Sequence, residues 1–347
     1  MKKILLLFMG VLLLTGCGKI KKEEDINKII SKINNVKSYK VTGNMEISND
    51  EETFTYSIES YYLKDNYYKV LLVNQTNNHE QIILRNNEDI YVITPSLNKS
   101  FKFQSSWPNN SSQSYMLKSI VKDIENDKNH TIEKKDNGYI VKTLVNYPNN
   151  NELKYQKIYI NKDNEFEKVE VYDENDIVKI KVEFSKIELN HGLKEEDFRL
   201  EDYINNNDDA DDNKNVECEN NEECTKEKKT VSIENIIYPL YIPSNTYLTS
   251  SERIDNGDAS RVILTFSGDK KFVLIEEASL RNSNMEIIPV YGEPLMLSES
   301  VGALSANSLS WDNGNISYYL ASTDLNINEM SLIANSLGNN VLVANTK

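Results

Sequence analysis

The stretch VKIKVEF, residues 178–184, alternates apolar and charged side chains at every position. Successive side chains of an extended chain point to opposite faces, so the four apolar residues share one face and the three charged residues share the other. The stretch FTYSIE, residues 54–59, has the same period of two. Both stretches therefore predict β-strands with one buried face and one exposed face.

Six further stretches between these two also predict strands and are separated by Asn, Asp and Gly turns: YYKVLLV (67–73), EQIILR (80–85), DIYVIT (89–94), YIVKTLV (139–145), LKYQKIYI (153–160) and FEKVEVY (166–172). Two segments have helical spacing instead, with apolar residues at Ile26, Ile29, Ile30 and Ile33, and at Leu117, Ile120, Val121 and Ile124. Sequential long strands with helices at the start and in the middle predict an α+β fold. In that fold a curved antiparallel sheet covers the helices.

The C-terminal part predicts a smaller α+β domain. The stretches RVILTF (261–266) and KFVLIEEA (271–278) form one strand pair, and SLSWDNGNISYYLAS (308–322) forms a hairpin at Asn313-Gly314, a dipeptide suited to positive φ. A final helix begins at Asn326, which can cap it together with Glu329, and ends at Gly338. Its apolar stripe consists of Met330, Ile333, Ala334 and Leu337.

A break in composition separates these two parts. The stretch from Glu201 to Cys224 holds ten acidic residues, one lysine and almost no apolar side chains. Such a segment cannot bury enough surface to offset its chain entropy, and it lacks the glycine of an EF-hand calcium loop. We therefore predict a solvated acidic linker over residues 201–230, between a first domain at 25–200 and a second domain at 231–347.

The N-terminus predicts an exported lipoprotein. Two lysines precede the uncharged run ILLLFMGVLLL, residues 4–14, which is typical of a signal peptide and shorter than the roughly 20 apolar residues of a membrane span. Because LTGC, residues 14–17, resembles a lipobox, we expect residues 1–16 to be removed and Cys17 to be lipidated. An ordinary cleaved signal peptide is the alternative.

Lipidation would place the protein on the outer face of the cytoplasmic membrane, with residues 17–24 as a polar tether. The covalent lipid would be a diacylglycerol at Cys17, with or without an N-acyl chain, and no other cofactor or metal is expected. The net charge of −15 becomes −17 when residues 1–16, which carry two lysines and no acid, are removed. Such an acidic chain is a poor candidate for binding nucleic acid, because phosphates are bound by Lys and Arg.

The two remaining cysteines, Cys218 and Cys224, are separated by five residues. An even number of cysteines at short spacing in an exported protein predicts a disulfide. A zinc site would need about four ligands, and the three histidines of the chain, at 79, 130 and 191, lie far away in sequence.

Ser96 and Lys99 have the Ser-x-x-Lys spacing of penicillin-binding enzymes. That motif works when the serine opens a helix and the lysine lies one turn further on. Here it lies in a connection between two predicted strands, and the same spacing recurs at Ser119 and Lys122. The companion motifs, a Walker loop, a His-Glu-x-x-His motif and a Gly-x-Ser-x-Gly elbow are all absent from the sequence. We therefore expect no catalytic residue.

The segment Ile82–Ile124 resembles the YdcC-type sporulation lipoproteins of bacilli and clostridia, to which GerS-like germination lipoproteins are related. Three blocks carry the resemblance: TPSLNK (94–99), QSSWP (104–108) and SIVKD (119–123). The resemblance extends over roughly residues 25–200 and implies a LolA/LolB-like fold, an open antiparallel half-barrel whose concave apolar face is covered by helices. The stretch SYYLASTDLNINEMSLIANSL, residues 317–337, is similar to the DUF4367 module.

The resemblance implies a non-enzymatic binding or chaperone protein that acts in sporulation or spore germination. Its partner would be a protein of the envelope or spore, such as a cortex-modifying amidase, or a lipid. Two alternatives stay open: a carrier that holds acyl chains in the half-barrel cavity, and an envelope-stress sensor that binds an anti-sigma factor. The candidate binding or structural block consists of Pro95, Asn98, Phe101, Phe103 and Trp107.

Thiol titration of the mature protein tests the predicted disulfide. Under denaturing, non-reducing conditions we expect no free thiol at Cys218 or Cys224, and two free thiols after reduction, because both sulfurs are held in one covalent bond. Mass spectrometry of a proteolytic digest would locate the bond. Two alkylated cysteines in the non-reduced sample would show that the disulfide is absent.

Overall fold

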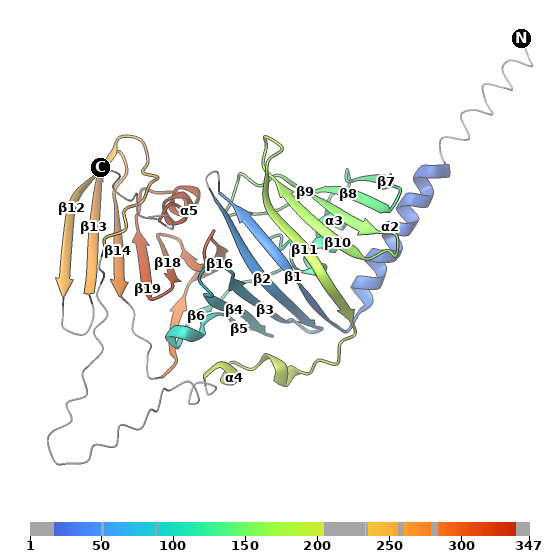
Figure 1. The fold of residues 1–347 in the computed structure, drawn as a ribbon, viewed down its shortest axis with the longest axis horizontal. Helices are drawn as coiled ribbons and strands as arrows, with labels where there is room; N and C mark the ends of the chain where they lie inside the picture. The colour runs from blue at the N-terminus through green and yellow to red at the C-terminus, as the bar shows by residue number, and fades with distance from the viewer. Residues whose placement is uncertain are drawn as a thin grey trace, which may run out of the picture. The chain divides into compact units, whose positions relative to one another are not determined.

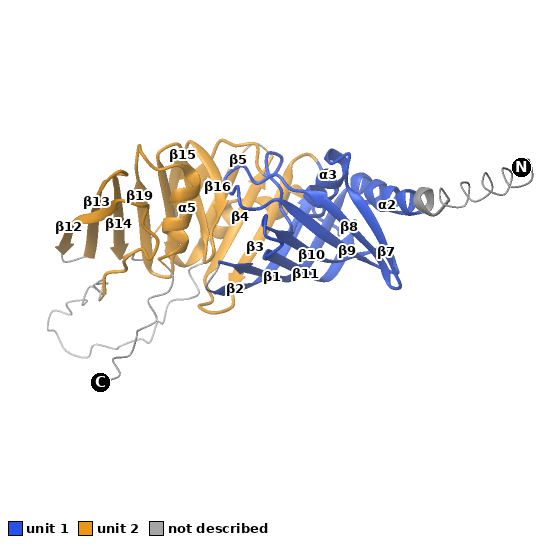
Figure 2. Ribbon diagram, turned by 90° about the horizontal axis from the view of Figure 1, so that it is seen from above, with its two compact units in different colours: residues 1–64, 108–193 blue, residues 65–107, 194–347 orange. Residues whose placement is uncertain are grey.

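A computed structural model describes residues 17–49, 52–87, 89–204, 233, 235–255, 260–278 and 284–337. The chain forms two compact units, of which unit 1 holds residues 1–64 and 108–193, and unit 2 holds residues 65–107 and 194–347 (Figure 2). The predicted ranges 25–200 and 231–347 divide the chain differently, since residues 65–107 belong to the same unit as the C-terminal part. Cys218, Cys224 and Gly338 lie outside the described residues, so the disulfide and the end of the last helix remain predictions.

Unit 1 contains a curved, fully antiparallel sheet (Figure 1). Its strands, in spatial order, are β2 (Thr53–Leu63), β1 (Ser38–Ser48), β11 (Val178–Leu189), β10 (Phe166–Tyr172), β9 (Tyr155–Asn161), β8 (Gly138–Leu144) and β7 (Thr131–Lys135). In chain order, β1 is the first strand of the unit and β11 is the last. These two strands pair, with Met45 opposite Val182. A register shift at Gly43 interrupts this pairing, and a Cβ atom there would lie 2.2 Å from the carbonyl oxygen of Glu183, so only glycine fits.

Two helices pack on one face of this sheet: α2 (Cys17–Asn35) and α3 (Leu117–Asn126). The predicted isoleucine stripe of α2 and the predicted apolar stripe of α3 are both buried. The prediction of a curved antiparallel sheet that covers helices is therefore confirmed. Residues 17–24, predicted as a tether, form the first turns of α2 and continue directly into its buried part.

Unit 2 contains two sheets. The first has, in spatial order, β15 (Glu286–Val290), β6 (Lys99–Phe103), β5 (Asp89–Thr94), β4 (Glu80–Asn86) and β3 (Tyr67–Asn74). Neighbours are antiparallel except β15, which pairs in parallel with β6. The C-terminal part thus supplies an edge strand to a sheet built from residues 67–103, an arrangement that the sequence did not predict. Two short helical turns, η2 (Glu195–Phe198) and α4 (Glu201–Ile204), precede the linker.

The second sheet of unit 2 is antiparallel and confirms the predicted C-terminal α+β arrangement. Its order is β12 (Thr246–Asp255), β13 (Ser260–Gly268), β14 (Phe272–Ala278), β19 (Ile316–Ala321), β18 (Ser308–Asn313), β17 (Val301–Ser305) and β16 (Gly292–Met296). The β18–β19 hairpin turns at Gly314, whose φ is 56°, as the Asn-Gly dipeptide predicted. The last helix, α5 (Ile327–Asn335), packs its predicted apolar stripe into the core of this sheet.

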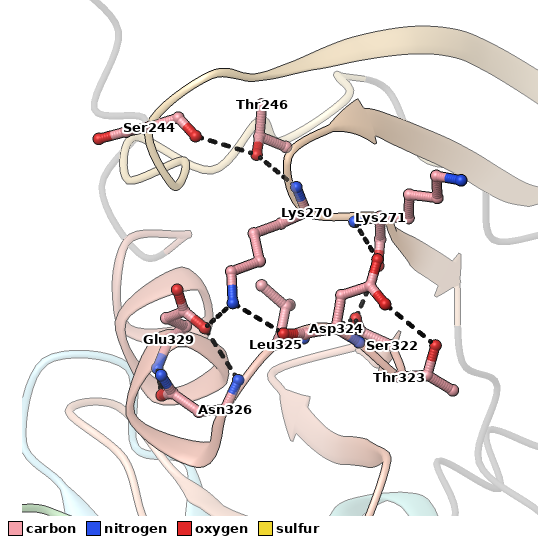
Figure 3. A network of polar contacts seen from close by, with 10 residues as sticks. All are labelled: Ser244, Thr246, Lys270, Lys271, Ser322, Thr323, Asp324, Leu325, Asn326 and Glu329. Atoms are coloured by element: carbon pink, nitrogen blue, oxygen red, sulfur yellow. Dashed lines mark hydrogen bonds and ion pairs between the residues drawn. The ribbon is translucent and has the colours of Figure 1, made fainter.

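A polar network fixes the start of α5 (Figure 3). The Asn326 side chain accepts the Glu329 N–H at 2.9 Å, and the Glu329 carboxylate accepts the Asn326 N–H at 2.8 Å, so the predicted capping box is confirmed. Lys270, from the β13–β14 connection, donates to the Asp324 carbonyl at 2.9 Å and forms an ion pair with Glu329 at 3.4 Å. Lys270 therefore connects the turn of the β13–β14 hairpin to the start of α5.

Glu276 is a buried carboxyl group in the core of unit 2. It lies on β14 between Val262 of β13 and Tyr318 of β19, and none of its surface is exposed. Its two oxygens accept the Ile237 N–H at 3.1 and 3.2 Å. Burial raises the pKa of Glu276 to about 7, although the hydrogen bond from Ile237 opposes the shift.

We expect Glu276→Gln to flatten the dependence of stability on pH. Because the pKa in the folded state is raised to about 7, the folded form keeps a proton that the unfolded form loses. Wild-type stability should therefore fall as pH rises from the unfolded-state pKa, roughly 4, through the folded-state pKa, and the glutamine variant should lack this loss. Above pH 7 the free energy of unfolding of Glu276→Gln should exceed that of the wild type by roughly 1–3 kcal/mol.

Urea unfolding at pH 5 and pH 8 measures this difference. Glu277→Gln is the matched control, because Glu277 is the partly exposed neighbour on β14 and pairs with Arg261 at 2.8 Å. Its effect should stay within about 0.5 kcal/mol at either pH. Equal pH slopes for wild type and Glu276→Gln would contradict the assignment.

Candidate functional site

The segment that carries the predicted block lies in unit 2 and begins with a turn between β5 and β6. Pro95 opens the short helical turn η1 (Pro95–Leu97), where a fixed φ and a missing N–H are tolerated. Asn98 ends it in the left-handed region, with φ 48° and ψ 47°, and donates its N–H to the Pro95 carbonyl at 3.2 Å. Asparagine accepts this conformation more readily than most residues, which explains its place in the turn.

Phe101, Phe103 and Trp107 are buried in unit 2. The Trp107 ring meets the Tyr68 ring edge-on, with centroids 6.4 Å apart, and the Trp107 carbonyl accepts a hydrogen bond from Arg85 Nη1. Of the two roles considered for this block, its placement favours the structural one, because these aromatic rings are packed inside the unit.

Ser96 and Lys99 lie in different surroundings. Ser96 is exposed, whereas the Lys99 Nζ lies 2.8 Å from Asp312 Oδ1 and 3.1 Å from Ser317 Oγ. The lysine ammonium group therefore contacts side chains of β18 and β19.

Lys99 and Asp312 form a buried ion pair. The Asp312 side chain has no exposed surface, and that of Lys99 is 14 % exposed. Ser317, which lies opposite Asp312 across the β18–β19 hairpin, also donates to Asp312 Oδ1 at 2.5 Å. Because the two charged residues are 213 positions apart in sequence, no motif search could have paired them.

Further polar contacts extend this pair into a seam between the two sheets of unit 2. Gln81 of β4 donates to the Val301 carbonyl at 3.1 Å and accepts the Val301 N–H at 2.5 Å. Asn77 donates to Asn313 Oδ1 at 3.3 Å. We use the name polar seam for Asn77, His79, Gln81, Lys99, Val301, Asp312, Asn313 and Ser317.

Besides Lys99 and Asp312, the polar seam contains a third titratable side chain, His79. Its side chain is buried, and burial lowers its pKa, although the negative charge of Asp312 opposes the shift. His79 Nε2 and Asp312 Oδ2 have no hydrogen-bond partner among the described residues. At neutral pH the His79 imidazole is therefore uncharged, and it is buried under the electrostatic influence of Asp312.

The tyrosine-rich strands of unit 1 place several rings against lysines. Tyr155 and Tyr172 stack with centroids 4.8 Å apart, and the ammonium groups of Lys142 and Lys157 lie 3.7 and 4.5 Å from the centres of these rings. Burial, with a contribution from Asp176, raises the pKa of Tyr155 to about 12. These two tyrosines therefore pack against each other and against lysine side chains on the sheet.

Within the ranges that the structure describes, no group of three or more His, Cys, Asp or Glu side chains is arranged to hold a metal ion. None of the described helices is both long enough and apolar enough to cross a bilayer. The backbone of Cys17 is the first position of α2.

Comparison with known proteins gives a family match over residues 1–198, to the model described as "Sporulation protein YdcC-like". The curated protein "Sporulation protein YdcC" of Bacillus subtilis (strain 168) is 35 % identical over 340 residues, which are 97 % of this chain and 97 % of that protein.

Solved structures give weaker similarities. The complex of the CwlD amidase from Clostridioides difficile with the GerS lipoprotein matches with 16 % identity and a TM-score of 0.30, over 47 % of this chain and 93 % of that chain. The MucA/MucB complex of Pseudomonas aeruginosa matches with 10 % identity and a TM-score of 0.32, over 91 % and 98 %. The LolA superfamily protein NE2245 from Nitrosomonas europaea matches with 14 % identity and a TM-score of 0.29, over 51 % and 98 %. Because these TM-scores are below 0.5, the family assignment depends on the sequence matches.

The buried ion pair can be tested by removing one partner. Lys99→Met leaves the Asp312 charge buried and should destabilise unit 2 by about 3–5 kcal/mol. The double variant Lys99→Met/Asp312→Leu should recover much of that loss, since no unpaired charge remains. Urea unfolding measures both effects. Ser96→Ala is the control and should change stability by less than about 0.5 kcal/mol; wild-type stability in Lys99→Met would contradict the pairing.

Proposed function

The chain belongs to the family of YdcC-like sporulation proteins, and from this membership we propose that it is a lipid-anchored binding or chaperone protein of sporulation or spore germination. Acylated Cys17 would hold it on the outer face of the cytoplasmic membrane. It would act without making or breaking covalent bonds, through a protein or lipid partner.

The observation that carries this proposal is the position of Cys17 on α2. The helix runs without a break from Cys17 to Asn35, and its apolar residues from Ile26 to Ile33 are buried in unit 1. At about 1.5 Å per residue, Cys17 and Ile26 are separated by roughly 14 Å along the helix axis. A lipid on Cys17 would therefore be joined to unit 1 through a helix and not through a flexible tether.

Polar contacts also hold the first part of α2 against unit 1. Tyr139 of β8 donates to Asp25 at 2.6 Å, and the His130 ring lies 3.3 Å from the Glu23 carboxylate. A body attached this closely to its anchor is suited to a fixed receptor or scaffold. A shuttle that leaves the membrane would instead need release of the anchor.

The carrier alternative would require the helices to move. The face of the sheet where an acyl chain would bind in a half-barrel is covered in unit 1 by the buried stripes of α2 and α3. Asp123 of α3 is further attached to the sheet through Gln156 of β9, whose Nε2 donates to it at 2.8 Å. An acyl chain would have to displace these contacts, which makes the fixed binding protein the better-supported proposal.

A role without bond chemistry is supported by the use of Lys99. Its ammonium group is engaged by Asp312 and Ser317 and is not available to activate Ser96. The Ser-x-x-Lys spacing is thereby accounted for by packing inside unit 2.

Cell fractionation of Cys17→Ala tests the anchor. The variant should move from the membrane pellet to the soluble fraction, because alanine cannot form the thioether bond to the lipid. Cys218→Ser is the matched cysteine control and should stay with the membrane. An unchanged membrane fraction for Cys17→Ala would defeat the anchor.

Affinity capture from sporulating cells, with mass spectrometry of both proteins and lipids, tests the mode of action. A stoichiometric envelope protein, such as a cortex-modifying amidase, would support the proposed binding role. Stoichiometric acyl lipid beyond the Cys17 anchor would favour the carrier instead, and a membrane-spanning anti-sigma factor would favour the stress sensor. Loss of function in a folded and normally abundant Ser96→Ala variant would contradict the non-enzymatic role.

A further inference from the structure

A small hollow in unit 2 lies between the turn at residues 297–300, the β18–β19 hairpin and the end of α5. The Leu297 N–H donates to the Ser300 carbonyl at 2.9 Å, which closes the turn. The Ser298 N–H donates to Asn335 Oδ1 at 2.8 Å, which attaches the turn to α5. The walls of the hollow are therefore held in place by hydrogen bonds, as is typical of a binding site that is formed before its ligand arrives.

One wall of the hollow is apolar. The Trp311 and Tyr318 rings stack with centroids 5.1 Å apart, and both side chains are buried. Leu297, Ala334 and Leu337 complete this wall. Such a wall can pack against the methylene groups of a ligand, whereas a charged group needs polar partners as well.

The hollow also contains two polar groups that can bind a hydrogen-bond donor. The half-buried Glu299 carboxylate accepts a hydrogen bond from Asn313 Nδ2, and a carboxylate offers about four acceptor positions in all. The Ser300 hydroxyl is buried and has no hydrogen-bond partner among the described residues. Because an unsatisfied buried hydroxyl is unfavourable, it indicates that a further group binds there.

The charge of the lining favours a cation. Glu299 is acidic, and none of the described residues that line the hollow is a lysine, an arginine or a histidine. Burial, with contributions from the negative charges of Glu276 and Glu299, raises the pKa of Tyr318, so its hydroxyl stays protonated. A phosphate or a carboxylate would therefore be repelled by Glu299, and a cation would be attracted.

The size of the hollow selects a small cation. Its cavity volume is about 10 Å³, which is close to the smallest space that holds one water molecule. A lysine ammonium group is a compact charge with three donors, whereas the guanidinium group of arginine is a wider, planar fork. The methylene stem of a lysine can also lie along an apolar wall while its charged end is hydrogen-bonded.

We propose that this hollow binds the ammonium group of a lysine side chain that a partner polypeptide presents to unit 2. The Glu299 carboxylate neutralises the charge, the Ser300 hydroxyl accepts one N–H, and the stem of the lysine packs against the wall of Trp311 and Tyr318. The site does not depend on the lipid proposed at Cys17.

Saturation-transfer NMR with the full mature chain tests this proposal. The probes are Nα-acetyl-lysine N-methylamide, its Nε-acetylated form and the arginine counterpart. The lysine probe should bind with a Kd on the order of 1–10 mM. The other two should bind at least about tenfold more weakly, because the acetylated probe lacks the charge and both carry an end group that is too large.

Variants of the hollow test the assigned groups. Glu299→Gln should weaken binding of the lysine probe by at least about tenfold, because a hydrogen bond to a charged group is stronger than one between neutral groups. Ser300→Ala should weaken it by about threefold. Glu293→Gln, on β16 and outside the lining of the hollow, is the matched control and should change the affinity by less than about twofold.

Thermal unfolding of each variant shows whether unit 2 is still folded. Equal binding of the three probes to the wild type, or no binding of the lysine probe, would show that the hollow holds only water and would overturn the proposal. Undiminished binding of the lysine probe by folded Glu299→Gln would overturn it as well.

Discussion

A buried lysine–aspartate pair holds together the two sheets of unit 2. An unpaired charge in a protein interior is strongly unfavourable, so Lys99 and Asp312 must meet whenever the unit is folded. Lys99 extends from β6, and Asp312 lies on the β18–β19 hairpin, so the pair fixes the position of one sheet against the other. The contact between Gln81 and Val301 strengthens the same seam with two hydrogen bonds.

The same pair explains the block of sequence that carried the family resemblance. Pro95 and Asn98 shape the turn that precedes β6, and the turn determines where Lys99 points. Phe101, Phe103 and Trp107 then anchor β6 and the chain after it in the core. Lys99, which has the spacing of a catalytic lysine after Ser96, is thus part of the packing between the two sheets of unit 2.

Helix α2 links the position of the proposed lipid to the sheet of unit 1. Its isoleucine stripe is part of the core, and its first residue is Cys17. A lipid at Cys17, as proposed above, would therefore be held at a fixed distance from unit 1.

The sequence by itself determined the elements whose signals are local. A period of two gave the strands, helical spacing gave the buried stripes of α2, α3 and α5, and Asn326 with Glu329 gave the capping box, because each of these depends on residues within a few positions. It also singled out five residues of the predicted block, but it could not assign them a place or find the polar seam around them. Only the tertiary structure decided that β15 pairs with β6, that Lys99 meets Asp312 across 213 positions, and that Glu276 is buried beside Tyr318. The physical reason is that strand pairing, burial and charge neutralisation depend on which distant segments come together, and no local pattern in the sequence records that.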